Sequence, residues 1–103
     1  MKTNVEDWQI VSVLDNGAIV GEVLWGICVD DSTRRFIKGD YIRTSRIVKS
    51  HNQLIETVSG NIYRLLGEGV KSHISITDIG LLRQGFSPQE IKYLNSTGIN
   101  KQH

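Results

Sequence analysis

One apolar stretch, residues 18–29, constrains the fold of this chain more than any other feature of its sequence. It directly follows Asn16-Gly17, the dipeptide most typical of a two-residue hairpin turn, and residues 8–14 before that turn predict a strand that pairs with it antiparallel. Apolar residues fall on both faces of residues 18–29, so we expect a strand that is covered on both sides and lies at the centre of a sheet.

Two glycines interrupt this central strand. Gly21 and Gly26 have no side chain to pack, so their presence predicts a sharp bend or the close approach of another segment, as at the corner of a small barrel. The sequence therefore favours a curled sheet over a flat one.

Turn signals further along the chain predict three more strands. The run of Asp, Ser and Thr at residues 30–33 is typical of a turn, and we favour this role for its two carboxylates over a cation site. The predicted strands cover residues 41–48, 54–58 and 62–66, the last two joined by a Ser-Gly-Asn turn. Short connections between five strands predict an antiparallel meander over residues 8–66.

The C-terminal part changes from strand to helix signals. Ser87, Pro88 and Glu90 form the pattern of a capping box with proline at the first helical position, which predicts a helix over residues 88–96. A shorter helix, capped by Thr77 or Ser75, is expected before it. The fold class is thus α+β: a five-stranded curled antiparallel sheet or a small, partly open SH3-like barrel, with two short helices within residues 77–97.

The length of 103 residues suits one domain that buries its own core, so we expect residues 1–103 to form a single domain. The polar, acidic start does not resemble a signal peptide, and no apolar run reaches the roughly 20 residues of a membrane span. Cys28 is the only cysteine, which excludes an internal disulfide and favours a buried structural role. We therefore expect a cytoplasmic protein that does not bind membranes.

Charge is unevenly distributed along the chain. Residues 1–33 contain six acidic residues and one basic residue, whereas residues 34–49 contain six basic residues and one acidic residue. The formal net charge of the whole chain is only +1, so the two segments nearly neutralise each other. The candidate interaction site consists of five side chains of the basic segment: Arg34, Arg35, Lys38, Arg43 and Arg46.

Two kinds of function follow from this distribution. A basic surface binds nucleic acid by releasing its counterions. Alternatively, the basic segment pairs with acidic residues on neighbouring strands, or in a C2 homodimer in which the acidic hairpin of one copy meets the basic strand of the other. Strand alternation places Arg43 and Arg46 on opposite faces, which favours pairing or self-association over a nucleic-acid surface.

Catalysis has little support in the sequence. His51 and His73 are far apart, and no pair of histidines has the spacing of metal ligands. A small hydrolase or transferase that uses His51 or His73 with Asp30 or Asp31 is the remaining enzymatic alternative, and it lacks an identifiable nucleophile. We therefore expect no enzymatic activity, no metal site and no cofactor.

Three short segments carry a resemblance to other proteins: Trp25-Gly26, residues 30–36 (DDSTRRF) and residues 39–45 (GDYIRTS). They are similar to the pattern W-G, D-D-x-T-x-R-F and G-D-Y-x-x-T-S in small single-domain bacterial proteins, some of them carried on mobile or phage-derived DNA. Those proteins have no assigned activity, so the resemblance implies no catalytic residue. The Gly-Asp turn is also similar to turns in SH3-like barrels, which agrees with a curled sheet.

The two C-terminal helices partly match a helix-turn-helix pair, but Gly80 and Gln84 occupy positions where such a pair needs apolar residues. Packing of both helices against the sheet is the favoured interpretation. The sequence thus predicts a non-enzymatic interaction module that binds a protein partner or itself, with nucleic-acid binding through residues 34–49 as the alternative.

Overall fold

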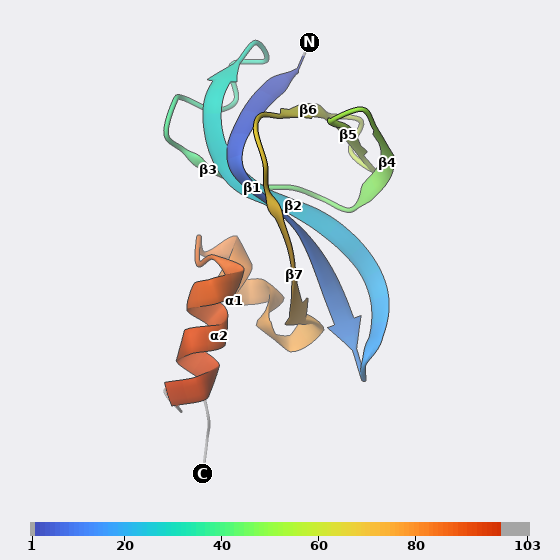
Figure 1. Cartoon of the computed structure of the whole chain (residues 1–103), viewed down its shortest axis with the longest axis vertical. Helices are drawn as coiled ribbons and strands as arrows, with labels where there is room; N and C mark the ends of the chain where they lie inside the picture. Colours follow the sequence, from blue (N-terminus) through green and yellow to red (C-terminus); the bar gives the residue numbers. More distant parts are fainter. Residues whose placement is uncertain (1, 98–103) are drawn as a thin grey trace.

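The computed structural model describes residues 2–97 and shows a curled, open sheet with two short helices packed against one end (Figure 1). A 3-10 turn (Ile76–Asp78) leads from the sheet into the helices α1 (Ile79–Arg83) and α2 (Pro88–Thr97). Within the described residues the sheet has seven strands: β1 (Thr3–Asp15), β2 (Ala18–Asp31), β3 (Tyr41–Arg43), β4 (Ile47–His51), β5 (Leu54–Thr57), β6 (Ile62–Leu65) and β7 (Val70–Ser75).

Strand β1 organises the sheet. On one side it pairs antiparallel with β2 along most of its length. On the other side it pairs parallel with two strands in turn, first with β6 and then with β7. The strand order is β3-β2-β1-β6-β5-β4, with β7 added beside the second half of β1. Every described strand except β3, β4 and β5 therefore hydrogen-bonds directly to β1.

A β-bulge divides β1 into two halves. Asp7 and Trp8 together lie opposite the single residue Gly26, and Asp7 adopts a left-handed backbone conformation with φ of 49°. One extra residue on a strand reverses the alternation of its side chains relative to the partner strand. Val5 and Val11 therefore lie in different cores, although both positions are odd-numbered.

The two cores lie on opposite faces of the sheet. Leu24 and Cys28 of β2 belong to the first core, which fills the curl of the sheet, while Val23 and Trp25 pack against the second core, beneath the helices. We call them the curl core and the helix core. The buried residues of the curl core are Val5, Leu24, Cys28, Ile42, Ile55, Tyr63 and Leu65, and those of the helix core are Val11, Val13, Ile74, Leu82 and Ile91.

Helix α2 begins as its sequence predicts. The backbone N–H of Ser87 donates to Glu90 Oε1 (2.8 Å), and the N–H of Glu90 donates back to Ser87 Oγ (3.1 Å), which completes the capping box. In the same turn, Gln89 and Gln9 of β1 exchange two amide hydrogen bonds of 2.7 and 2.9 Å. Ile91 is buried in the helix core, so the start of α2 is fixed to the sheet by both polar and apolar contacts.

The capping box gives the first testable expectation. Replacing Ser87 by alanine removes the acceptor for the Glu90 N–H and should lower the free energy of unfolding by about 1 kcal/mol. Urea denaturation at neutral pH measures this change. Ser96→Ala, which removes one exposed hydroxyl from the last turn of the same helix, is the matched control and should change stability by less than about 0.5 kcal/mol. Equal effects of the two substitutions would argue against the cap.

The strand predicted over residues 41–48 is wrong, because the chain divides it into β3 and β4 at opposite edges of the sheet. Thr44 causes the division. Its N–H donates to the carbonyl of Leu24 and its Oγ1 accepts from the N–H of Leu24, both at 3.0 Å, so this buried residue fastens the end of β3 to β2. The chain then bends at Ser45 and crosses the sheet to begin β4.

The predicted meander and barrel also need correction. The sequence analysis missed β7, and β6 and β7 both pair with β1 in parallel, so the sheet is mixed rather than a simple antiparallel meander. The sheet does not close into an SH3-like barrel. The strand predicted to be central, β2, is indeed bent and apolar on both faces, but β1 holds the central position.

Candidate functional site

The turn that holds the first two candidate arginines is built around one carboxylate. Asp31 Oδ1 accepts hydrogen bonds from Thr3 Oγ1 (2.8 Å), Thr33 N (2.9 Å) and Thr33 Oγ1 (2.6 Å), and Asp31 Oδ2 accepts from the backbone N–H groups of Arg35 (2.7 Å) and Phe36 (2.8 Å). Burial by itself raises the pKa of this carboxyl group, but the hydrogen bonds from Thr33, Thr3 and Phe36 outweigh it and hold the pKa well below its usual range. Asp31 thus acts as the anchor of the turn, as the turn prediction for residues 30–33 requires.

Arg35 is engaged inside the molecule. Its guanidinium group lies over the rings of Phe36 and Tyr63, 5.0 and 5.7 Å from their centroids. Its Nε donates to Thr33 Oγ1 (2.9 Å) and one terminal nitrogen donates to the Tyr63 hydroxyl (3.4 Å). The neighbouring Arg34 is exposed and has φ of 64°. Of this pair, only Arg34 presents an unengaged guanidinium group to solvent among the described contacts.

The other three candidate basic residues are spread along β2. Lys38 lies in the loop before β3, Arg43 pairs with Trp25, and the Arg46 side chain packs against Gly21, 3.2 Å from where a β-carbon would stand. From Gly21 to the Asp31 turn the strand extends roughly 30 Å at about 3.3 Å per residue. The structure therefore does not gather the five residues into one site, and their role in binding stays a prediction.

One pair of the enzymatic alternative, His73 with Asp30, is not brought together in the structure. His73 pairs with Ser12 in the second half of β1, whereas Asp30 pairs with Asn4 near its start and accepts hydrogen bonds from the Asn4 amide. Eight residues of strand separate these positions, roughly 26 Å. Among residues 2–97, no group of three His, Cys, Asp or Glu side chains is placed to hold a metal ion.

Cys28 is buried in the curl core, as the sequence predicts. Its burial, together with the negative charges of Asp31, Asp40 and Asp30, raises the pKa of the thiol. A raised pKa reduces the thiolate fraction at neutral pH, so this cysteine has the surroundings of a structural residue rather than of a nucleophile.

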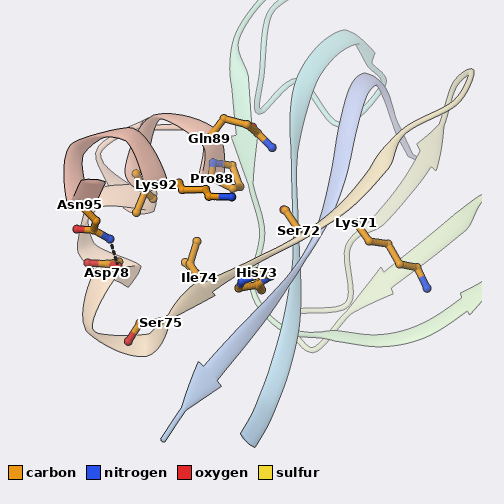
Figure 2. A pocket seen from close by; sticks show the side chains of 11 residues that line it. Lys71, Ser72, His73, Ile74, Ser75, Asp78, Pro88, Gln89, Lys92 and Asn95 are labelled. Carbon is orange, nitrogen blue, oxygen red and sulfur yellow. Dashed lines mark hydrogen bonds between the residues drawn. The ribbon is translucent and has the colours of Figure 1, made fainter. Parts of the chain in front are cut away.

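The clearest concave feature is a groove between β7 and α2, which we call the helix-side groove (Figure 2). Its volume is about 430 Å³. Five consecutive residues of β7 line it, so it runs along the edge of that strand rather than over one face. The lining residues are Lys71, Ser72, His73, Ile74 and Ser75 on the sheet, Asp78 on the turn, and Pro88, Gln89, Ile91, Lys92 and Asn95 on the helix.

A second hollow of about 320 Å³ lies on the face of the sheet that the helices leave uncovered. We call it the open-face hollow. Ser12, Leu14 and Ile19 form one side of it, and residues 71–73 of β7 form the other. The same three residues of β7 thus border both hollows.

The strand between the two hollows has a free edge. Within the described residues β7 pairs only with β1, so the backbone groups along its other edge make no ladder hydrogen bonds. Ile74 is buried in the helix core, and strand alternation then directs Ser72 to the helix side and Lys71 and His73 to the open face. The Ser72 hydroxyl is buried without a hydrogen-bond partner among residues 2–97.

Sequence reasoning missed this site because its central strand was not recognised. The run VKSHIS contains only two apolar residues, and it follows Gly67-Glu68-Gly69, a segment typical of the end of a sheet. The available signal was the alternation of Val70, Ser72 and Ile74 with Lys71 and His73, which is a weak strand pattern.

Comparison with known proteins places the chain in a family. The model of a family described as a domain of unknown function (DUF6957) matches residues 3–81. The chain belongs to this family. The part that matches DUF6957 includes the whole sheet and the turn before α1, whereas α2 lies beyond it. The helix-side groove therefore has one wall inside the DUF6957 match and one wall outside it.

No curated protein and no solved structure matches the chain. In the part of the chain that the structure describes, no helix has the length and apolar character needed to cross a membrane.

Proposed function

We propose that this member of DUF6957 is a non-enzymatic interaction module that binds an extended segment of a partner protein as an additional strand along β7. One observation supports this most directly: the free edge of β7 lies between two hollows on opposite faces of the sheet, and both are lined by Lys71, Ser72 and His73. This is the arrangement that an added strand needs.

The physical argument starts from the backbone. A strand that pairs with an exposed edge gains affinity from main-chain hydrogen bonds, and hollows that receive its alternate side chains provide specificity. Successive side chains of a strand point to opposite faces. Along β7, one set of partner side chains would enter the helix-side groove and the other set the open-face hollow.

The position of α2 supports the same function. The Gln9–Gln89 amide pair and buried Ile91 fix the first turns of α2 beside β7, so one wall of the groove is formed before any partner binds. A preformed wall reduces the ordering that binding requires. The helix also leaves the free edge of β7 open to an extended chain (Figure 2).

Strand addition predicts a specific pattern of amide protection. We expect that a linear octapeptide selected from a random display library against the full chain slows hydrogen exchange and shifts amide resonances in Val70–Ser75 and the first turn of α2. NMR on the ¹⁵N-labelled protein measures both effects. Strand β4, which forms another edge of the sheet, is the internal control and should keep its exchange rates.

Two results would contradict this function. The first is a selected peptide that binds but changes exchange only outside β7 and α2. The second is a library from which no peptide is enriched above the level obtained with an unrelated folded protein.

A further inference from the structure

We infer that the segment bound along β7 is acidic; this rests on the proposed strand addition. Lys71 and Lys92 are both exposed, and neither makes an ion pair with a described residue. Figure 2 shows Lys71 directed away from α2 and Lys92 on the helix itself, so a positive charge stands on each side of the free edge. Carboxylates at successive positions of a bound strand point to opposite faces, so one would meet Lys71 and the next Lys92.

The one acidic side chain of the groove does not cancel this charge along the edge. Asp78 Oδ2 accepts a hydrogen bond of 3.0 Å from the Asn95 amide, which holds the carboxylate against α2. Figure 2 places this pair at the end of the groove away from Lys71. Counting His73 as neutral, the charged residues that line the groove carry two positive charges and one negative charge.

The residues of β7 also argue against a second copy of this chain as the segment that binds along the free edge of β7. Val70–Ser75 contains no acidic residue. A two-fold antiparallel pairing of β7 with itself requires facing residues of the same parity, which sets Lys71 of one copy opposite His73 or Ser75 of the other. Self-pairing would leave both lysines uncompensated, whereas an acidic segment provides the opposite charge directly across the strand.

Three synthetic octapeptides test the inference: in each, two valines alternate with two glutamates, two serines or two lysines, so that both faces of the bound strand carry the tested side chain. At low ionic strength the glutamate peptide should bind the full chain about tenfold more tightly than the serine peptide and the lysine peptide more weakly than either, with the differences shrinking as salt is added. Isothermal calorimetry measures affinity, and amide exchange in β7 locates the site. The double variant Lys71→Glu/Lys92→Glu should reverse the order of the glutamate and lysine peptides.

The matched control is Lys49→Glu/Arg64→Glu, which makes the same charge change at two exposed residues of β4 and β6. It should retain the original order. If all three peptides bind with equal affinity and protect β7, strand addition stands and the acidic preference is wrong. The same conclusion follows if none of the three protects β7 but the library-selected peptide protects it. If no peptide protects β7, both proposals fail.

Two further outcomes would overturn the acidic peptide as the partner. One is displacement of the glutamate peptide from β7 by a single-stranded oligonucleotide that binds more tightly. This result would mean that the lysines beside β7 bind nucleic acid rather than an acidic peptide. The other is protection of β7 in the peptide-free protein together with a dimer in light scattering, which would assign the edge to a second copy of this chain.

Discussion

Replacement of Gly26 by alanine is expected to lower the free energy of unfolding by about 3 kcal/mol, because the new β-carbon has no room. A β-carbon at this position would meet the Val5 side chain and would stand 3.3 Å from the carbonyl oxygen of Glu6 and 3.4 Å from the α-carbon of Trp8. Two of these three neighbours are backbone atoms of the bulged strand. The most severe contact is with Val5, which is fully buried in the curl core, so its relief requires this side chain or the part of β1 that carries it to move.

Urea denaturation followed by tryptophan fluorescence measures this loss. Gly80→Ala is the matched control: Gly80 lies in α1, and a β-carbon there meets nothing within 4 Å. Alanine at a helical position without steric conflict should stabilise the protein by up to about 1 kcal/mol. Opposite signs for the two substitutions are the expected result, and a Gly26→Ala protein as stable as the unmodified chain would mean that the bulge tolerates a wider strand separation than the structure shows.

The bulge opposite Gly26 links the fold to the proposed binding edge. Before the bulge, β1 pairs with β6 and contributes Val5 to the curl core. After it, β1 pairs with β7 and contributes Val11 and Val13 to the helix core. One extra residue thus lets a single strand support two cores on opposite faces, and β7 with its free edge belongs to the half that the helices cover on one face only.

Local signals in the sequence predicted those parts of the fold that neighbouring residues determine. The turn at Asn16-Gly17 forms with positive φ at both residues, 51° and 84°, as a type I′ hairpin requires. The capping box of Ser87 and Glu90 forms as its spacing indicates. Gly26 was predicted to mark a bend or a close approach, and the close approach of β1 confirms it. Each of these features depends on residues adjacent in sequence or on one strand pair.

Long-range pairing could not be predicted in the same way. β7 binds β1 in parallel across more than fifty residues of chain, and no local pattern in its few apolar residues specifies that partner. The division of β3 from β4 depends on the hydrogen bond between Thr44 and Leu24, a contact that forms only in the folded sheet. The candidate site lies between β7, which was not predicted, and α2, which was. The groove between them could therefore not be predicted from the sequence.

Four residues of the resemblance pattern hold the fold together. Gly26 faces the bulge, Thr44 joins β3 to β2, and the hydroxyl of Tyr41 donates to the carbonyl of Arg83 in α1 (3.1 Å). Asp31 anchors the turn that follows β2. These four residues of the pattern therefore support the fold, and the proposed binding edge lies outside the pattern.

The second large effect is expected at Asp31. Replacing it by asparagine should lower the free energy of unfolding by about 3 kcal/mol at pH 7, because hydrogen bonds to a charged acceptor contribute about 1.5–3 kcal/mol each and several are lost or weakened together. Asparagine keeps one acceptor oxygen but places an amide N–H₂ against donors, such as the backbone N–H groups of Arg35 and Phe36. Asp30→Asn is the control: Asp30 is exposed and, among residues 2–97, its side chain accepts only from the Asn4 amide, so its loss should change stability by less than about 1 kcal/mol.

The difference in unfolding free energy between the unmodified chain and Asp31→Asn should depend on pH. This dependence shows whether the turn needs the charge of Asp31 or only the shape of its side chain. The folded protein holds the pKa of Asp31 well below the value of about 3.9 that an aspartate has in an unfolded chain. A carboxyl group with a lowered pKa stabilises the fold fully above its unfolded value, and that stabilisation is lost as the pH falls toward the folded value. The stability gap between the unmodified chain and Asp31→Asn should therefore be constant above about pH 5 and should narrow between about pH 4 and pH 2 in urea denaturation. A gap that stays constant down to pH 2 would mean that the turn depends on the shape of this side chain and not on its charge.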